Sequence, residues 1–393
     1  MDFPFSFGQK SSLLLIFFFH LIVFSLLLLV KGIIHGKKSV KWLSLLLFLS
    51  AMYITPYMLG YANWYSQKIT REILFFIPFM QVLLIGPVVY FYTQSLLNTT
   101  FQLTKKDWIH FLPFILYSFY SLIVFITDKF IFHEYYFYAN GRDKDLATWY
   151  QIAGLLSMSI YLILSLRYYA NYKKLIFDTV SYAETILFRW IRSFMVAFLG
   201  ILILRLLFFI LNPDWGEFGS QFWHYILFSL VFYYISINGY ANAIKSTFFT
   251  ERKNGEINVL VQEKEKSKGV IQDTAIEKDI DVWKVKLADL ITNKRLYENP
   301  RLTLQDVANE LRTTTKIISS VVNKGFQMNF NDFINHYRIQ AVKAKIKAKE
   351  HDSSTLLGIA LDSGFNSKAT FNRAFKKGTG LSPKDYIENS VSK

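Results

Sequence analysis

The segment that follows Ser367 places polar and basic side chains along one face of a predicted helix. Phe371 and Phe375, four residues apart, form its apolar face. The opposite face presents Lys368, Ala369, Asn372, Arg373 and Lys376. In the major groove of DNA, arginine can donate two hydrogen bonds to guanine and asparagine can pair with adenine, whereas lysine contacts phosphate. These residue types and their spacing therefore predict a helix that binds double-stranded DNA.

Two similar helical units in tandem would position this helix. The first unit spans about 303–324 and the second about 355–377. Threonine or serine precedes several of the helices as an N-cap, and Gly364 supplies the positive φ that a tight turn between two helices often requires. A longer helix, from about Asn331 to Lys349, joins the units. Helix-turn-helix pairs of this kind insert their second helix into the major groove.

The charge distribution agrees with a nucleic-acid partner for this end of the chain. The 393 residues contain 44 Lys and Arg against 29 Asp and Glu, a formal net charge of +15. From Arg295 onward there are 16 cations and 9 anions, so this small domain alone carries +7. For any single lysine, a solvated basic face without a role in DNA binding is the alternative.

The second unit also resembles a known family. Residues 364–377 read GFNSKATFNRAFKK and residues 380–383 read GLSP, which is similar to the signature of AraC/XylS-type transcription regulators. Residues 329–335, NFNDFIN, and the pair Tyr337-Arg338 resemble the linker helix between the two units of that family. The likeness covers roughly Val282–Ile387, about a quarter of the chain. It implies that the two units insert their second helices into successive major grooves on one face of DNA.

By position in the family, the resemblance implies base-facing residues in both units. They are Lys316, Ser319 and Ser320 in the first unit, and Lys368, Ala369, Asn372 and Arg373 in the second. The first unit departs from the family in having no arginine among these positions. Two further departures are Arg312, which stands where a turn glycine is common, and Ile387, which stands where an arginine often follows the final tyrosine.

The first 244 residues have the composition of a membrane domain. They hold 29 charged residues, whereas the remaining 149 hold 44. Seven apolar segments have the roughly 20 residues that cross about 30 Å of hydrocarbon: Ser12–Val30, Val40–Tyr61, Ile73–Leu97, Trp108–Thr127, Trp149–Ala170, Trp190–Leu211 and Phe222–Tyr240. Two stretches, Gly86–Tyr92 and Asp107–Phe114, loosely resemble multi-pass, membrane-tethered regulators. We therefore predict an all-α chain, with a seven-helix transmembrane bundle (1–244), a charged linker (245–281) and a cytoplasmic domain of two tandem helix-turn-helix units joined by a linker helix (282–393).

The cations of the short loops predict the orientation of this bundle. Loops after the first, third and fifth segments carry 11 Lys and Arg, whereas the opposite side carries 6. Because cytoplasmic loops are enriched in Lys and Arg, the N-terminus is predicted outside and the C-terminal domain inside. Together with the resemblance, this orientation predicts a multi-pass protein of the bacterial inner (cytoplasmic) membrane.

Three polar side chains fall within the predicted spans. His20, Gln81 and Arg205 each lie roughly 9–12 Å from the outer end of a helix, at 1.5 Å per residue. Ionisable groups inside a membrane are expensive to bury, so we predict that these residues line a pocket for an unidentified stimulus or small ligand. The alternative is that Arg205 extends toward the outer interface while the other two make hydrogen bonds between helices.

The segment between the two domains is polar. Residues 263–268 read EKEKSK, which is typical of a solvated helix or a flexible linker. Ile280, Trp283, Leu287, Leu290 and Ile291 then recur at helical spacing. This amphipathic helix either packs on the following domain or forms a self-pairing seam that makes the protein a homodimer.

The sequence contains none of the common catalytic or metal-binding patterns. There is no cysteine, which excludes disulfides, thiolate chemistry and cysteine-based metal sites. A glycine-rich phosphate loop, a His-Glu-x-x-His motif and a nucleophile elbow are all missing. We therefore predict a protein without enzyme activity, cofactor or metal. The competing hypothesis is a transporter or partner-binding membrane receptor whose DNA-binding tail reports occupancy.

Overall fold

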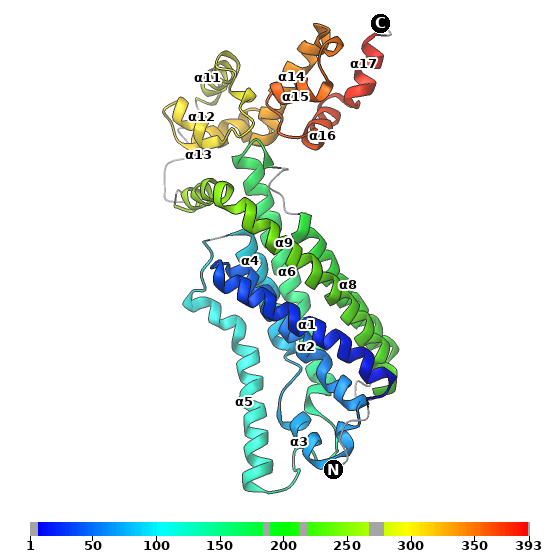
Figure 1. Ribbon diagram of the computed structural model, residues 1–393. Helices are drawn as coiled ribbons and strands as arrows, with labels where there is room; N and C mark the ends of the chain where they lie inside the picture. The colour runs from blue at the N-terminus through cyan, green and yellow to red at the C-terminus, as the bar shows by residue number, and fades with distance from the viewer. Residues whose placement is uncertain (1–6, 99, 184–188, 213–217, 267–278, 392–393) are drawn as a thin grey trace. The chain divides into compact units, whose positions relative to one another are not determined.

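The computed structural model describes residues 7–98, 100–183, 189–212, 218–266 and 279–391 (Figure 1). The predicted all-α class is confirmed, because these residues form helices and no β-strand beyond one isolated bridge. The chain divides into two compact units. Unit one comprises residues 1–169 and 189–255, and unit two comprises residues 170–188 and 256–393.

Unit one consists of long apolar helices. Among the described residues, six helical stretches are long and apolar enough to cross a membrane. The helices of this unit are α1 (Gln9–Ile34), α2 (Lys38–Tyr61), α3 (Lys68–Phe76), α4 (Val82–Leu97), α5 (Leu112–Ile126), α6 (Thr148–Thr179), α8 (Arg189–Leu211) and α9 (Phe218–Lys266). The C-terminal ends of α6 and α9 belong to unit two.

The third apolar segment is not the single helix that we predicted over Ile73–Leu97. The helix α3 ends at Phe76, and α4 begins only at Val82 and is 16 residues long. Ile77 has extended backbone angles, φ −96° and ψ 115°, because a residue before proline is sterically disfavoured in the helical region and Pro78 follows. Hydropathy alone did not reveal this break, since apolar residues continue through it.

A close approach of helices brings α4 against α6. A Cβ added at Gly154 of α6 would lie 2.6 Å from the Val82 side chain and 3.2 Å from Arg205. Only glycine therefore fits at this crossing. The same crossing places the Arg205 side chain of α8 next to the backbone of α6.

Unit two contains the two predicted helix-turn-helix units. Its helices are the ends of α6 and α9, then α11 (Ile280–Asn293), α12 (Leu304–Glu310), α13 (Thr315–Ser320), α14 (Phe330–Lys347), α15 (Leu356–Asp362), α16 (Lys368–Thr379) and α17 (Pro383–Val391). One apolar core lies under α11–α13 and the start of α14, and a second lies between the end of α14 and α15–α17. In the first unit, α13 passes directly into a π-helical turn, Val321–Gly325.

The local signals for helix starts and turns are confirmed. Thr303 and Asp306 form a reciprocal capping box at α12, and Ser367 caps α16 by accepting a hydrogen bond from the Thr370 amide. Gly364 has φ +92° in the turn before α16. Arg312, at the position where family members often have glycine, has φ +51°. A left-handed residue is thus required there too, and arginine supplies it at some cost in backbone strain.

The connector is described only in part. The helix α9 continues to Lys266, whereas 267–278 and most side chains of the predicted linker lie outside the described residues. Beyond this gap, the amphipathic helix α11 packs on unit two, with Leu287 and Ile291 fully buried in its first core. Val282 and Val285 on its other face are exposed. The homodimer seam stays a prediction.

Candidate nucleic-acid interface

The helix α16 presents the predicted DNA-reading face. Its apolar side is fixed in the second core, where Phe371 is 2% exposed and Phe375 is fully buried. The five candidate residues Lys368, Ala369, Asn372, Arg373 and Lys376 are all exposed on its other side. The N-cap at Ser367 and the two phenylalanines thus determine both the start of the helix and the face that it turns to solvent.

The helix α13 presents a less open face. Thr314 caps it by accepting a hydrogen bond from the Ile317 amide, and Ile318 anchors it in the first core. Its candidate residues Lys316, Ser319 and Ser320 are half-buried, and Asn323 Nδ2 donates a hydrogen bond to Ser319 Oγ at 3.2 Å. The first unit therefore offers shorter and more enclosed donors than the second.

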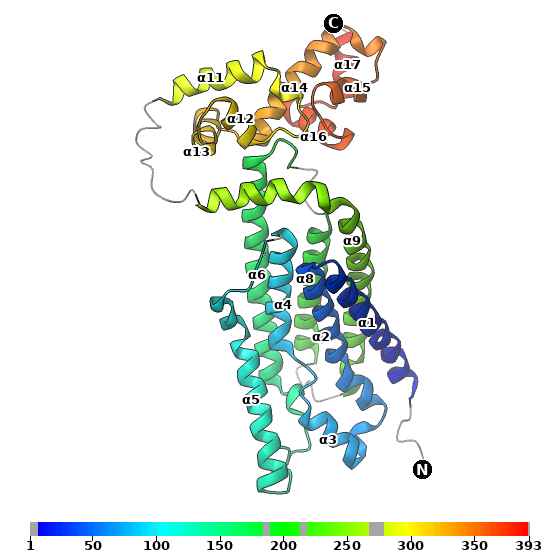
Figure 2. The ribbon, with the colours of Figure 1, turned by 60° about the vertical axis from the view of Figure 1, so that its left-hand side comes forward.

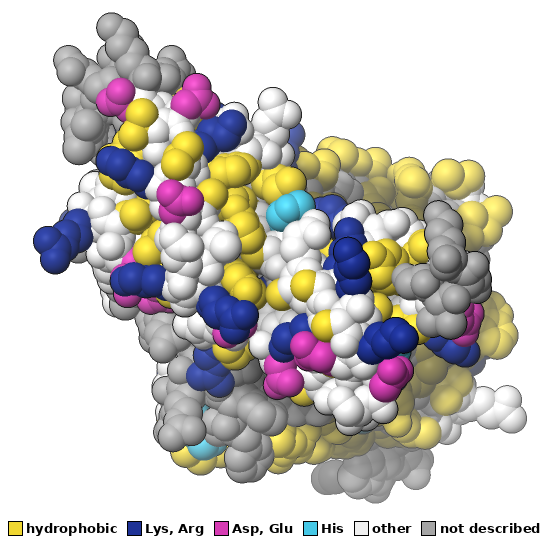
Figure 3. Space-filling view, turned by 90° about the horizontal axis from the view of Figure 1, so that it is seen from above, with side chains coloured by type: hydrophobic (Ala, Val, Ile, Leu, Met, Phe, Trp, Pro, Cys, Tyr) yellow, Lys and Arg dark blue, Asp and Glu magenta, His cyan; other side chains and the backbone are white. Residues whose placement is uncertain are grey.

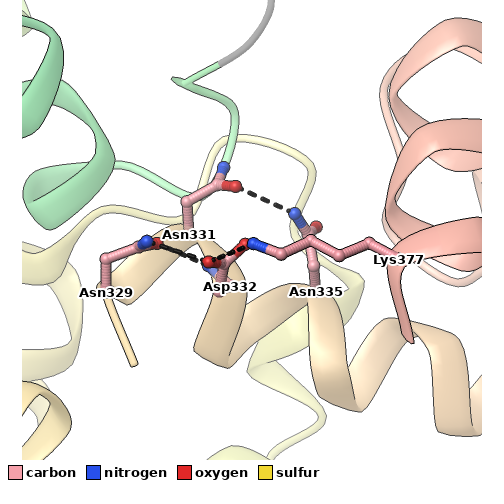
Figure 4. A network of polar contacts seen from close by, with 5 residues as sticks. All are labelled: Asn329, Asn331, Asp332, Asn335 and Lys377. Atoms are coloured by element: carbon pink, nitrogen blue, oxygen red, sulfur yellow. Dashed lines mark hydrogen bonds and ion pairs between the residues drawn. The ribbon is translucent and has the colours of Figure 1, made fainter. Parts of the chain in front are cut away.

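A polar network ties the second unit to the start of the linker helix (Figure 4). Asp332 of α14 accepts hydrogen bonds from Lys377 Nζ of α16, at 2.6 Å, and from Asn329 Nδ2, at 2.9 Å. Asn335 Nδ2 donates to Asn331 Oδ1 at 3.0 Å. Lys377 consequently has a structural partner, whereas its exposed neighbour Lys376 is the lysine assigned to the DNA-reading face.

Arg338 of α14 was not predicted to have a structural role. It is 1% exposed, and its Nε donates to the Tyr297 carbonyl at 2.8 Å while Nη2 donates to the Asn299 carbonyl at 2.8 Å. Burial lowers the pKa of Arg338 to about 9, so the guanidinium stays protonated at neutral pH. The turn at Gly364 touches the same place, since a Cβ there would lie 2.1 Å from the Tyr297 carbonyl oxygen and 3.0 Å from Arg338 Nε. Arg338 therefore joins the segment before α12, the linker helix and the turn of the second unit.

The two candidate reading helices lie on one side of unit two. Figures 1 and 2 both draw α13 and α16 at the same edge of this unit, with α14 between and above them. The face drawn in Figure 3 instead mixes Lys and Arg with Asp and Glu and offers no continuous cationic surface. The edge with α13 and α16 is thus the better candidate for DNA.

In unit one, the three residues predicted to line a pocket have different partners. Arg205 Nη2 donates to the Gln151 carbonyl at 2.9 Å and to Gln151 Oε1 at 2.7 Å, and its guanidinium lies 5.6 Å from the Tyr53 ring centroid. His20 Nε2 lies 2.7 Å from Ser236 Oγ. Gln81 Nε2 donates to the Pro78 carbonyl, in the break before α4. The described contacts do not join the three residues into one cluster, and their sensing role stays a prediction.

A buried carboxylate pair between α5 and α6 was missed by the sequence analysis. Asp143 is 5% and Asp145 3% exposed. Tyr65 OH donates to Asp143 at 2.5 Å, while Tyr117 OH and the Met80 amide donate to Asp145 at 2.6 and 2.8 Å. Burial and the adjacent Asp145 carboxylate raise the pKa of Asp143 well above its ordinary value. Two aspartates in a loop are common in any sequence, so only their tertiary partners identify the pair.

Comparisons with known proteins concern the C-terminal part of the chain. Residues 307–389 match the family model described as a helix-turn-helix domain. The chain is 29% identical over 85 residues to the melibiose operon regulatory protein of Escherichia coli (strain K12), which is 22% of this chain and 27% of that protein. The protein of the same name from Escherichia coli O6:H1 (strain CFT073) matches with the same figures, so the chain spans about a quarter of the length of these curated relatives. No solved structure was found to match the chain. Residues 307–389 thus form a helix-turn-helix domain of the AraC type, which confirms the resemblance read from the sequence.

Proposed function

We propose that this chain is a membrane-bound, sequence-specific DNA-binding transcription regulator that couples a membrane or extracytoplasmic stimulus to gene expression. The observation that carries the proposal is the exposed face of α16, with Arg373 and Asn372 beside Lys368 and Lys376 on a capped helix of an AraC-type domain. Its partner is double-stranded DNA, and the activity needs neither a catalytic centre nor a cofactor.

The two units have different roles in this proposal: unit one is the membrane domain and unit two is the DNA-binding domain. The apolar helices of unit one, with the 16-residue α4 counted as a seventh crossing, would anchor the chain in the bacterial inner membrane, with the N-terminus outside and unit two in the cytoplasm. This orientation is supported by the 11 to 6 distribution of short-loop cations. His20, Gln81 and Arg205 are the proposed stimulus-sensing residues, and a homodimer through α11 is the proposed assembly.

Binding to DNA tests the proposal directly. The full-length protein, purified in lipid nanodiscs, would be used to select duplexes from a random-sequence pool, and its affinity for the selected duplex would then be measured at several salt concentrations. Arg373→Ala should weaken binding to the selected duplex by about 1–3 kcal/mol, or roughly 5- to 150-fold, and relax the preference at one base pair. Lys376→Ala should weaken binding to all duplexes alike and reduce the salt slope by about 1.

Lys347→Ala is the matched control. Lys347 is exposed in the last turn of α14, outside both reading helices, and its removal changes the net charge by the same amount. If Arg373→Ala weakens binding no more than Lys347→Ala does, α16 is not the base-reading helix and the site assignment is wrong.

A further inference from the structure

The C-terminal end of α6 and the four residues after it belong to unit two. Residues 170–183 cluster with the DNA-binding domain and not with the rest of α6. Ile176, Val180, Ser181 and Ala183 are fully buried. We call residues 176–183 the docking segment. Ile176, Val180 and Ala183 pack with Tyr182 in a small apolar cluster of their own, and the hydrogen bonds described next join the segment to the DNA-binding domain.

The docking segment contacts the start of the first helix-turn-helix unit and the linker helix. Val180 forms an antiparallel bridge with Thr303, the N-cap of α12, and the Ser181 amide donates to the Leu302 carbonyl at 3.0 Å. Arg338 Nη1 donates to the Ser181 carbonyl, and its Nη2 to Ser181 Oγ, both at 3.0 Å. Two hydrogen bonds from a charged donor make this a specific contact, since such bonds contribute about 1.5–3 kcal/mol each.

The same part of the chain borders the end of the first reading helix. A groove of about 520 Å³ lies between it and residues just after α13, and is lined by Ala170, Lys173, Lys174, Phe177, Asp178, Asn323, Gln327, Met328 and Asn329. Within unit two, Figures 1 and 2 draw the end of α6 between α13 and α16, at the edge where both reading helices lie. In Figure 4 the Asn331 side chain points toward this green segment.

DNA needs the space between the two reading helices. Two recognition helices that enter successive major grooves on one face of a duplex are about 34 Å apart along it, and the sugar-phosphate backbone between those grooves passes across the gap. A polypeptide segment held in that gap would overlap with the duplex. We propose that the docking segment is an autoinhibitory element that holds the domain in a state unable to bind both grooves, so that DNA binding requires its withdrawal. This inference rests on the proposed function, because it assigns a regulator to the same DNA-binding surface.

Withdrawal of the docking segment would expose side chains that can donate hydrogen bonds to phosphate. Arg338 would lose both Ser181 acceptors on Nη1 and Nη2 while remaining cationic, and a phosphate oxygen can accept from the same donors. Asn331 is 1% exposed and its Nδ2 has no hydrogen-bond partner in the described residues. DNA phosphates would therefore accept the hydrogen bonds that Arg338 loses when the docking segment withdraws.

A disulfide can lock the docking segment, because the chain has no cysteine of its own. Residues paired in an antiparallel bridge have Cα atoms about 4.5–5.5 Å apart, within the range of about 4.4–6.8 Å that a disulfide spans. The test protein is the full-length Val180→Cys, Thr303→Cys variant in nanodiscs, and the probe is a random-sequence pool of duplexes of about 30 base pairs, long enough for two successive major grooves. Each single-cysteine variant, oxidised in the same way, controls for the loss of the Thr303 cap.

We expect the oxidised double variant to bind the selected duplexes at least about tenfold more weakly than its reduced form, with recovery on reduction. Val180→Asp should act in the opposite direction, since a buried carboxylate at this contact disfavours docking, and should bind more tightly than the unsubstituted protein. The inference is overturned if the disulfide fails to form, or if the oxidised and reduced proteins bind alike. The proposed function itself fails if no duplex binds to any of the reduced double variant, the single variants and Val180→Asp. This inference then fails with it.

Discussion

The substitution Gly364→Ala adds one methyl group next to the buried Arg338 and so tests how closely the turn packs there. Alanine at this position has to adopt φ +92°, and its Cβ would lie 2.1 Å from the Tyr297 carbonyl oxygen and 2.9 Å from the Glu298 Cα. Gly380, the C-cap of α16, is a matched control: its φ is +80°, but a Cβ there meets no atom within 4 Å. Gly380→Ala therefore measures backbone strain alone, whereas Gly364→Ala measures strain together with steric overlap.

The expected magnitudes follow from these contacts. A left-handed conformation costs a non-glycine residue about 1–2 kcal/mol, which should be the whole effect of Gly380→Ala. At Gly364 the Tyr297 carbonyl also has to move by about 1 Å to reach ordinary contact distance, and it then loses the 2.8 Å hydrogen bond from Arg338 Nε. A hydrogen bond to a charged group contributes about 1.5–3 kcal/mol, so Gly364→Ala should destabilise the domain by about 3–5 kcal/mol.

A buried thiol can report this destabilisation in the full-length protein. Val342→Cys places a thiol of similar size at a fully buried position of the second core, in a chain without other cysteines. Its labelling rate under native conditions measures the opening free energy of that core, at about 1.4 kcal/mol per tenfold. Gly380→Ala should accelerate labelling about 5- to 30-fold, and Gly364→Ala more than about a hundredfold. Equal acceleration by the two substitutions would refute the close approach of Gly364 to Tyr297.

Two further predictions concern unit one. Because the pKa of Asp143 is raised, the protonated Asp143 stabilises the fold fully below the ordinary aspartate pKa, and this stabilisation is lost as the pH rises through the raised pKa. Hydrogen exchange of residues 128–147, corrected for the intrinsic rate, should therefore be faster at pH 8 than at pH 5. Burial also raises the pKa of Asp145 to about 6, so Asp143→Asn should reduce this difference to the part that Asp145 contributes, and a difference that is undiminished in the variant would contradict the assignment. The orientation can be tested with single cysteines at the exposed positions Asn140 and Lys173 and a membrane-impermeant maleimide. Asn140→Cys should be labelled in intact cells, whereas Lys173→Cys should be labelled only after the membrane is permeabilised. Labelling of Lys173→Cys in intact cells would reverse the proposed topology.

The features that the sequence predicted correctly depend on residues close together in the chain. Thr303 caps an amide three residues later, Ser367 does the same, and the φ of Gly364 follows from the need for a tight turn. The exposed face of α16 follows from Phe371 and Phe375, because an apolar pair at i and i+4 determines which side of a helix is buried. Short-range physical chemistry was sufficient for these assignments.

The features that the sequence did not predict depend on partners far apart in the chain. Arg338 would ordinarily be expected on the surface of a helix, and it is buried only because carbonyls from Tyr297, Asn299 and Ser181 converge on it. Asp145 is recognised by the Met80 amide, 65 residues away, and by Tyr117. The break at Pro78 does not show in the hydropathy of this segment, since the flanking residues are apolar on both sides and a hydropathy average does not report backbone geometry.

The helix α6 gives the proposed regulator a route from stimulus to DNA. The same continuous helix carries Gln151, which accepts both hydrogen bonds from Arg205, and ends one residue before Val180 of the docking segment. A stimulus that changes the Arg205–Gln151 contact would therefore act on an element whose other end holds the autoinhibitory contact. To move the domain from 1% to 99% active, the stimulus would have to favour the undocked state by about 5.5 kcal/mol. The two Arg338–Ser181 hydrogen bonds, at about 1.5–3 kcal/mol each, are of this size, so they would suffice to hold the domain in the docked state until such a stimulus acts.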